Sequence, residues 1–326
     1  MELLRDSDID SSALAGKRVA ILGYGNQGRA QALNLKDSGV DVVVGLRGAS
    51  GSRQEAEEAG LETALVEDAT ASANVIMFLA PDEAIGGIYQ EVEPRLRDGV
   101  AIGFSHGLAI HFNFIEPRCD LDVFLIAPKG PGRALRSLYQ EGQGMIALWA
   151  VAQDATGNAR ETTLAYGKAI GCARAGLLAS SFGEECEADL FNEQAVVWGA
   201  VPEILVAGFE TLTDAGIAPE VAFLECVGEL KLLADLIEGN GIAAMREAIS
   251  NTAELGAVLG GPRIVDEHVR RRMQDIFAEV SSGHFARQLQ AEADGGYPLL
   301  EKARAVARGQ AVEHMFEKLR AVAKRD

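Results

Sequence analysis

Apolar residues in the first half of the chain come in short, nearly unbroken runs, which are typical of strands that are buried on both faces of a sheet. Segments with helical periodicity separate these runs. The alternation predicts a mostly parallel sheet covered by helices on both sides. The predicted strands are residues 17–22, 42–44, 74–80, 100–104, 123–127, 145–151 and 173–179.

The hydrophobic pattern changes after Ser181. From Glu184 onward the apolar residues recur with helical spacing, and no convincing strand pattern follows. The sequence therefore predicts two domains: an α/β domain over residues 1–181 and an all-α domain over residues 182–326.

Several helices predicted in the second domain are strongly apolar. Residues 195–212 and 221–237 carry more hydrophobic surface than one small bundle can hide, which indicates helix packing between subunits. The last segment, 301–326, is predicted to be one amphipathic helix.

Composition narrows the class of protein. The chain has 326 residues and a net charge of −18, which argues against a nucleic-acid or anionic-membrane partner. No apolar run approaches the ~20 residues of a membrane span, and the N-terminal residues lack an apolar signal core. The four cysteines show no CxxC spacing, as expected for thiols in a reducing compartment. We therefore expect a cytoplasmic protein that binds a small molecule.

A glycine-rich loop follows the first predicted strand and precedes a helix. This context favours dinucleotide binding, because the glycines allow close approach to a pyrophosphate and the helix N-terminus supplies N–H groups. The alternative is a chance glycine turn. The loop residues are Gly23, Tyr24, Gly25, Asn26, Gln27 and Gly28.

The loop after the second predicted strand indicates which dinucleotide is bound. A fold that prefers NAD usually has an acidic residue here, which binds the ribose 2′-hydroxyl. This chain has Arg47, followed by Ser50 and Ser52. A guanidinium and two hydroxyls suit a 2′-phosphate, so the loop favours NADPH over NADH. A solvated Gly/Ser turn is the alternative.

Two polar residues lie just past the carboxyl ends of predicted strands, where ligands gather in such folds. His106 follows residues 100–104, and Lys129 follows residues 123–127 within a Pro- and Gly-rich loop. Each also has a structural interpretation, as a buried histidine or an exposed loop lysine.

Two carboxylate pairs have the i, i+4 spacing that puts both side chains on one face of a helix. They are Asp189 with Glu193, and Glu225 with Glu229. Both pairs have apolar neighbours, where a carboxylate is costly unless a cation neutralises it. The pairs indicate hard cations with oxygen ligands, most often Mg²⁺. Two solvated acidic faces are the alternative.

Taken together, these motifs resemble the class I ketol-acid reductoisomerases nearly end to end. The most specific parts, which occur in this order, are GYGNQG, APKGPG, ADLFNEQ, ECVGELK and ISNTAE. The resemblance implies an enzyme that uses NADPH and Mg²⁺ to convert a 2-aceto-2-hydroxy acid into a 2,3-dihydroxy acid, in valine, leucine and isoleucine synthesis. An alkyl migration precedes a hydride reduction.

The resemblance also implies residue roles. Asp189 would bridge two Mg²⁺ ions and Glu193 would complete one site. Glu225 and Glu229, from the other subunit of a dimer or larger assembly, would serve the second. Glu229 could carry a proton, because clustered carboxylates seldom all ionise normally. Ser250 would bind the substrate carboxylate, and His106 and Lys129 match active-site positions. Positions that match cofactor contacts are Asp82, Glu83, Ala84, Ile85 and Gly132.

Some residues depart from the family pattern. Arg29 and Gln31 stand where the family often has His, Gly228 replaces a frequent His, and Leu255 replaces a frequent Tyr. None removes a predicted metal ligand. A branch acting on a related 2-hydroxy-3-keto acid, a metal-independent β-hydroxyacid-dehydrogenase-like enzyme and a non-catalytic dinucleotide sensor remain alternatives.

Overall fold

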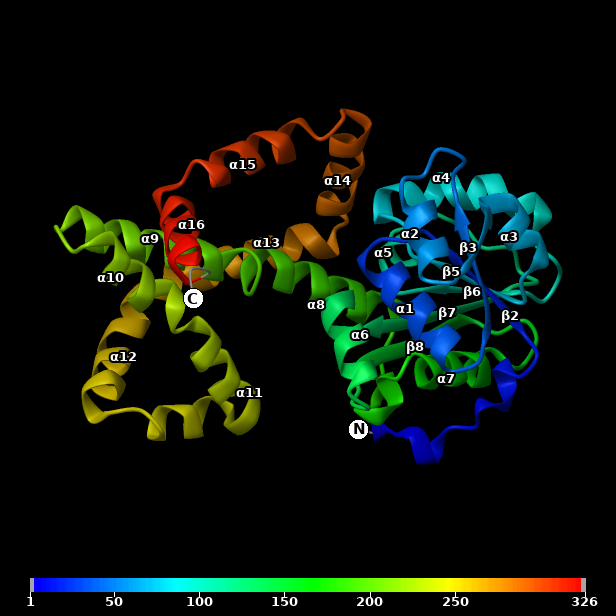
Figure 1. Cartoon of the computed structure of the whole chain (residues 1–326), viewed down its shortest axis with the longest axis horizontal. Coiled ribbons are helices and arrows are strands. Elements are labelled where there is room, and N and C mark those ends of the chain that lie inside the picture. Colours follow the sequence, from blue (N-terminus) through cyan, green and yellow to red (C-terminus); the bar gives the residue numbers. More distant parts are fainter. Residues whose placement is uncertain (1–2, 324–326) are drawn as a thin grey trace. The chain divides into compact units, whose positions relative to one another are not determined.

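The computed structural model describes residues 3–323, which form two compact units divided between Ala188 and Asp189 (Figure 1). The first unit contains a nine-stranded sheet with helices on both faces, and the second is built from helices. The predicted fold class, a Rossmann-type α/β domain followed by an all-α domain, is confirmed.

The sheet has the strand order β1-β9-β8-β7-β6-β5-β2-β3-β4. The strands from β7 to β4 are parallel, whereas β8 runs antiparallel to β7 and β1 antiparallel to β9. The antiparallel pairs could not be predicted, because an apolar run does not encode strand direction. The strands are β1 (Leu3–Leu4), β2 (Arg18–Leu22), β3 (Asp41–Leu46), β4 (Glu62–Leu65), β5 (Val75–Phe78), β6 (Ala101–Phe104), β7 (Asp122–Pro128), β8 (Ala147–Gln153) and β9 (Leu177–Ala179).

Each of the seven predicted strands is present, but β1 and β4 were not predicted. Strand β4 lies at the edge of the sheet, and none of its four side chains is fully buried. It therefore lacks the apolar run that marks an inner strand. Strand β1 has only two residues, which is too short for a pattern.

Alternate residues of each inner strand enter separate cores on the two faces of the sheet. In β2, Val19 and Ile21 pack in one core with residues of α1 and α7, whereas Ala20 and Leu22 pack in the other with residues of α3 and α4. The helices of this unit are α1 (Asn26–Asp37), α2 (Ser52–Glu58), α3 (Val66–Ser72), α4 (Asp82–Val92), α5 (Leu108–His111), α6 (Gly132–Gln140), α7 (Ala159–Ala169) and the start of α8 (Phe182–Ala195), with short 3₁₀ turns η1 (Asp6–Asp8), η2 (Ser11–Leu14), η3 (Glu93–Arg95) and η4 (Cys172–Arg174).

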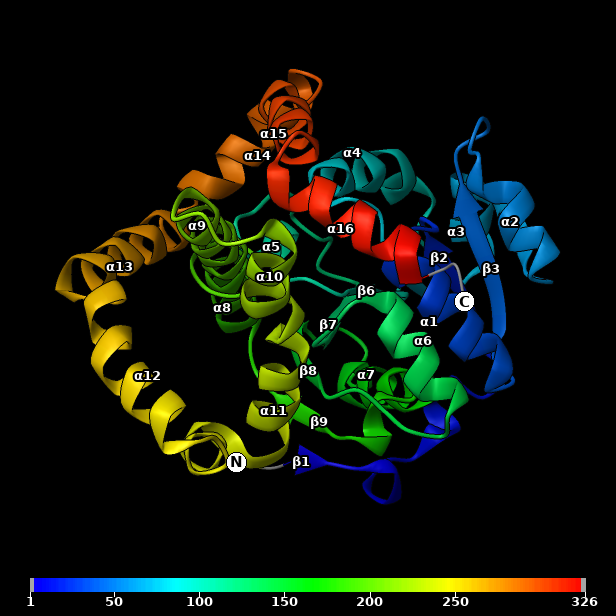
Figure 2. The same cartoon turned by 60° about the vertical axis from the view of Figure 1, so that its left-hand side comes forward.

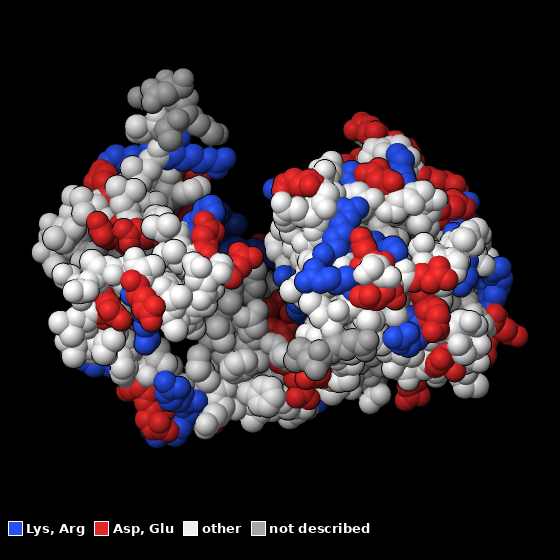
Figure 3. All heavy atoms as spheres, turned by 90° about the horizontal axis from the view of Figure 1, so that it is seen from below, with Lys and Arg blue, Asp and Glu red and all other residues white. Residues whose placement is uncertain are grey.

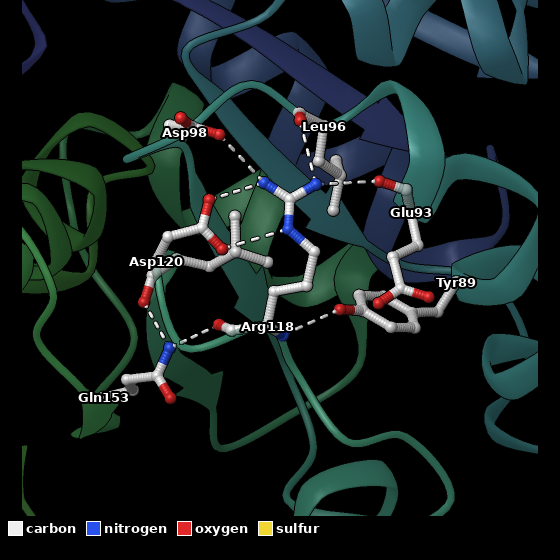
Figure 4. Close-up of polar contacts among 8 residues, drawn as sticks. Tyr89, Glu93, Leu96, Asp98, Arg118, Asp120 and Gln153 are labelled. Carbon is white, nitrogen blue, oxygen red and sulfur yellow. Dashed lines mark hydrogen bonds and ion pairs between the residues drawn. The ribbon is translucent and has the colours of Figure 1, made fainter.

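The connection into β7 is held by Arg118 (Figure 4). Its guanidinium donates to the backbone carbonyls of Glu93 and Leu96 and pairs with the carboxylate of Asp120. Gln153 of β8 in turn donates to the carbonyl of Arg118 at 2.7 Å. The loop before β7 is thereby fixed to η3 and β8.

In the helical unit, the described residues Phe209, Ala222, Val312 and Met315 form one small buried core. Val280 and Ala286 are buried elsewhere in the unit. The predicted helices are present with shifted bounds, and the last predicted helix is two helices that break at Gly309; residues 324–326 lie outside the described part. The helices are α9 (Ala200–Asp214), α10 (Pro219–Phe223), α11 (Leu230–Glu247), α12 (Asn251–Ile264), α13 (Glu267–Ser281), α14 (His284–Asp294), α15 (Pro298–Arg308) and α16 (Ala311–Ala323) (Figure 2).

A one-turn π-helix, η5 (Leu224–Gly228), joins α10 to α11. Glu225 lies within this turn and Glu229 directly follows it. The π-turn widens the helix locally, so the regular i, i+4 stacking predicted for these two glutamates does not apply unchanged. Turns of this kind are frequent at functional sites.

Candidate active site

The glycine loop lies at the point where the strand order reverses, because β2 is flanked by β3 and β5 and the chain proceeds from them to opposite edges. Ligands bind at such points in doubly wound sheets. Gly23 has φ +104°, and a Cβ there would lie 2.7 Å from the Leu79 carbonyl oxygen. A Cβ at Gly28 would lie 2.3 Å from the Gly23 oxygen. Both positions therefore require glycine for the tight turn.

The N-terminus of α1 is open towards this loop. No side chain caps the helix, and a Cβ built on Gly25 would meet no atom within 4 Å. First-turn N–H groups and the helix dipole are available to an anion there. These features fit the pyrophosphate of a dinucleotide. A cleft of about 730 Å³ adjoins the loop and is lined by Tyr24, Gly25 and Asn26, by Gly132, and by residues of α1 and α6.

The loop after β3 presents one cationic side chain to solvent. Arg47 is exposed, and no side chain of the described residues pairs with its guanidinium. Its carbonyl accepts from the Ser50 N–H at 3.0 Å, and the Ser50 hydroxyl accepts from the Ser52 N–H at 3.3 Å. Arg53 instead donates to Thr63 of β4. The loop thus offers Arg47 and two serines to a ligand.

The remaining residues expected to contact the cofactor lie at helix starts. Asp82, Glu83 and Ala84 are partly exposed in the first turn of α4, whereas Ile85 is buried in the core. Gly132 begins α6, and a Cβ there would lie 2.0 Å from the Asn26 carbonyl oxygen. Gly132 therefore allows the starts of α1 and α6 to touch.

Glu185 of α8 is the centre of the polar cluster at the ends of β6 and β7, although sequence reasoning did not assign it a role. Its side chain is 1% exposed. Oε2 accepts from the Gly107 N–H at 2.8 Å and lies 3.0 Å from His106 Nδ1, and Oε1 accepts from Lys129 Nζ at 3.0 Å. The sequence did contain a signal for Glu185, because it precedes Asp189 by four residues, the same i, i+4 spacing that marked the two predicted carboxylate pairs.

The two charged partners stabilise each other's ionised forms. Burial lowers the pKa of His106, but hydrogen bonds with Cys186 and Glu185 and the nearby carboxylate charge outweigh burial and hold this pKa well above its usual value. Burial raises the pKa of Glu185, but His106 and Lys129 outweigh that effect and lower it. Burial also raises the pKa of the Cys186 thiol. The ionised Glu185 carboxylate therefore accepts from His106 Nδ1–H.

One group of side chains has the donors for a divalent cation. The ligand atoms of His106, Glu185 and Asp189 lie within 4.8 Å of one another. Asp189 follows Glu185 by one turn of α8. Carboxylate oxygens suit Mg²⁺, which usually keeps several waters and takes one or two protein carboxylates. The donor set therefore fits a hydrated magnesium ion.

The other predicted ligands lie outside that group. Glu193, one turn after Asp189, is exposed, as are Glu225 and Glu229. Among residues 3–323, His106, Glu185 and Asp189 form the one such group of possible ligands. Ser250 is exposed and caps α12, where its hydroxyl accepts from the Ala253 N–H at 3.2 Å. A single chain thus does not gather all four predicted carboxylates.

A Rossmann-type sheet, a glycine loop at its switch point and a buried carboxylate cluster nearby define an NAD(P)-dependent oxidoreductase with a candidate metal site. Residues 13–176 match the acetohydroxy acid isomeroreductase NADPH-binding domain, and residues 182–325 match the ketol-acid reductoisomerase C-terminal domain. The chain belongs to the ketol-acid reductoisomerase family.

Solved structures agree with the family. The chain is similar to an NADH-preferring ketol-acid reductoisomerase from an uncultured archaeon, with 41% identity, a TM-score of 0.95, and coverage of 98% of this chain and 99% of that one. Two more distant structures share the fold alone. One is a semialdehyde dehydrogenase NAD-binding protein from Cupriavidus necator, with 19% identity, a TM-score of 0.62, and coverage of 81% of this chain and 98% of that one. The other is a pyrroline carboxylate reductase from Plasmodium falciparum, with 11% identity, a TM-score of 0.52, and coverage of 82% of this chain and 98% of that one.

The family establishes the activity. The chain is an NAD(P)H-dependent oxidoreductase and isomerase of branched-chain amino-acid biosynthesis, and its reaction depends on Mg²⁺. The metal-independent dehydrogenase and the non-catalytic sensor are set aside, because the family match extends through both units.

Proposed function

We propose that this ketol-acid reductoisomerase prefers NADPH, holds two Mg²⁺ ions, and acts on 2-acetolactate and 2-aceto-2-hydroxybutyrate in the cytoplasm. The observation that carries the proposal is the convergence of His106, Lys129 and Glu185 beside Asp189 at the carboxyl ends of β6 and β7. Catalysis needs such a fixed set of charges where the substrate's oxygens lie.

The acidic residues have the roles of metal ligands in this proposal. Asp189 and Glu193 would hold the metal ions together with Glu225 and Glu229 from a second subunit. Bound divalent ions supply Lewis acidity, which lowers the pKa of a substrate hydroxyl and polarises the neighbouring carbonyl. Glu229 is also a catalytic residue in this proposal, and Ser250 binds the substrate carboxylate.

The cationic residues orient the substrate and its developing charge. Lys129 Nζ donates to Glu185 Oε1 at 3.0 Å, which fixes the ammonium charge where it can stabilise negative charge on a substrate oxygen. Hydrogen bonds with Cys186 and Glu185 raise the pKa of His106, so its ring can supply a proton to the product. Glu185 holds the side chains of His106 and Lys129 in fixed positions, which limits the geometries that the reacting atoms can adopt.

The cofactor is proposed to extend from the glycine loop to the start of α4. Residues 23–28 receive the pyrophosphate, while Arg47, Ser50 and Ser52 bind the 2′-phosphate. Asp82, Glu83, Ala84 and Ile85, with Gly132, border the cofactor. The preference for NADPH rests on Arg47, whose exposed guanidinium suits a phosphate dianion. The archaeal relative is described as NADH-preferring, so cofactor preference varies among similar chains.

The helical unit is proposed to pack against a second copy, in a homodimer or larger assembly. Large apolar side chains lie on its surface, including Trp198 at 64%, Leu259 at 64% and Leu299 at 66% exposure. Such surface marks an interface. Figure 3 shows extensive uncharged area on this unit. We place the domain boundary at residues 181 and 182.

One segment, Phe182–Asp214, is apolar and long enough to cross a membrane by length and composition, which is weak evidence by itself. Its more apolar part, after residue 194, still carries Glu203 and Glu210. Carboxylates inside a bilayer are costly. A second copy of the chain therefore explains the apolar surface better than a membrane does.

A direct assay tests the proposed substrate and cofactor. Purified protein, NADPH, Mg²⁺ and 2-acetolactate are combined, and loss of cofactor absorbance is followed. Turnover that is abolished by EDTA and restored by Mg²⁺ is expected. Absence of turnover with both 2-acetolactate and 2-aceto-2-hydroxybutyrate would refute the substrate assignment, and faster turnover with NADH would refute the cofactor preference.

A further inference from the structure

A chain of buried hydrogen bonds runs from α7 through α1 to the two loops that carry His106 and Lys129. The Tyr166 hydroxyl donates to Gln31 Oε1 at 2.7 Å. Gln31 Nε2 donates to the Ser105 hydroxyl at 2.9 Å and to Gln27 Oε1 at 3.1 Å. Gln27 Nε2 donates to the Gly130 carbonyl at 2.9 Å.

The amide of Gln31 is held in one orientation by these contacts. Gln31 and Tyr166 are both 0% exposed, so water does not reach them to replace a lost partner. An amide has two N–H donors and one carbonyl acceptor. Here the nitrogen serves two acceptors and the oxygen accepts from Tyr166, so rotating the amide would break all three bonds. An unsatisfied buried polar group is costly, and the network therefore favours one geometry.

The two ends of this network are next to the two cationic residues of the active site. Ser105 immediately precedes His106, and Gly130 immediately follows Lys129. The side chains of His106 and Lys129 themselves both contact Glu185 of α8. Each loop is thus fixed from α1 and from α8. The N-terminus of α1 lies within the glycine loop that would bind the dinucleotide. One helix therefore holds the loops of His106 and Lys129 at a fixed distance from the cofactor site.

We propose that Gln31 is a positioning residue, which acts through Ser105 and Gln27 to hold His106 and Lys129 in register with the cofactor helix. This inference rests on the proposed roles of His106 and Lys129. Gln31 touches neither of them, so its loss changes their placement and not their chemistry. Small misplacements of reacting groups reduce kcat strongly, whereas ground-state binding depends on them less.

The test compares Gln31→Met with Asn34→Leu in the full-length protein. Asn34 lies on the same helix, is also 0% exposed and also makes two side-chain hydrogen bonds, but its partners are the Ile170 carbonyl and Arg136. Gln31→Met is expected to lower kcat by about 10- to 100-fold, as loss of a supporting contact behind catalytic groups does. Asn34→Leu is expected to lower Tm to a similar extent and leave kcat within about twofold.

Two measurements separate positioning from general damage. The NADPH Kd, measured by fluorescence without substrate, is expected to change less than about twofold in both variants. The His106 imidazole ¹⁵N shifts, assigned by their loss in His106→Asn, are expected to move in Gln31→Met and not in Asn34→Leu. Equal kcat and unmoved His106 shifts in the two variants would overturn the proposal.

Two further variants keep the outcomes distinct. Lys129→Met, assayed in parallel, tests the proposed function itself: full activity there removes the role of Lys129. Inactive Lys129→Met together with unchanged kcat in Gln31→Met overturns only the positioning role. Where Gln31→Met does not fold, Tyr166→Phe removes one partner of the amide; reduced kcat with unchanged NADPH Kd supports the proposal, and unchanged kcat overturns it.

Discussion

His106 Nδ1 lies 3.0 Å from Glu185 Oε2, although the two residues are 79 positions apart in the sequence. Glu185 also accepts from Lys129, so one buried carboxylate fixes the side chains of both His106 and Lys129 in the candidate active site. Replacing this carboxylate by an amide of the same shape tests how much of the geometry depends on it.

Glu185→Gln is expected to lower kcat by about 100-fold or more. The carboxylate accepts hydrogen bonds from His106, Gly107 and Lys129, whereas the amide nitrogen of glutamine would be a donor facing one of these donors. Steady-state kinetics with saturating Mg²⁺ and NADPH measure this. Glu184→Gln is the matched control, since Glu184 is exposed on the same turn and pairs with Ser180. Similar rates for the two variants would contradict the central role of Glu185.

Arg47→Asp is expected to shift cofactor preference from NADPH towards NADH by at least about tenfold in kcat/KM, because it removes the phosphate's partner and adds a like charge. The ratio of kcat/KM for the two cofactors measures the shift. Arg53→Gln is the control, because Arg53 contacts Thr63 instead of facing the ligand. An unchanged ratio in Arg47→Asp would show that the 2′-phosphate binds elsewhere.

Glu193→Gln is expected to abolish Mg²⁺-dependent isomerisation while NADPH binding stays within about twofold, since a neutral amide is a much weaker ligand for a hard cation. Isothermal titration with Mg²⁺ and with NADPH, in separate experiments, measures the two effects. Glu203→Gln, at an exposed carboxylate on α9, should bind both normally. Lost NADPH binding in Glu193→Gln would indicate damage to α8, not to a metal site.

Subunit mixing tests the shared active site. Asp189→Asn and Glu225→Gln should each be inactive alone. If the two residues serve one site from different subunits, unfolding and refolding an equal mixture should restore about a quarter of wild-type activity, because about half of the dimers are mixed and each has one intact site. A mixture of Asp189→Asn with Glu193→Gln should stay inactive. No recovery in the first mixture would mean that each site comes from one chain.

Acid stability tests the Arg118 connection. Hydrogen bonding from Arg118 lowers the pKa of Asp120 from 3.8 to about 2. A carboxyl whose pKa is lower in the folded state stabilises the fold above its unfolded pKa, and this contribution is lost as pH falls towards 2. Partial exposure screens the effect. Asp120→Asn should therefore be less stable than wild type at pH 5, and the urea midpoints of the two proteins should converge only as the pH approaches about 2. Asp98→Asn, at a far more exposed partner, should show a smaller difference at pH 5.

The sequence by itself determined the two-part architecture, because burial on both faces of a sheet requires unbroken apolar runs and helices require a longer period. It also located the glycine loop and the Arg47 loop, because each is a local feature of a few adjacent residues. It missed β4, whose edge position leaves no apolar run to detect.

Only the tertiary structure decided which polar residues meet. Nothing in the sequence distinguished Glu185 from its neighbours Glu184 and Glu187, whereas in the structure Glu185 alone of the three is buried against the ends of β6 and β7. The link from Gln31 to Ser105 joins residues 74 positions apart, and no local pattern encodes such a contact. Side-chain partners depend on which strands become neighbours, a property of the folded chain as a whole.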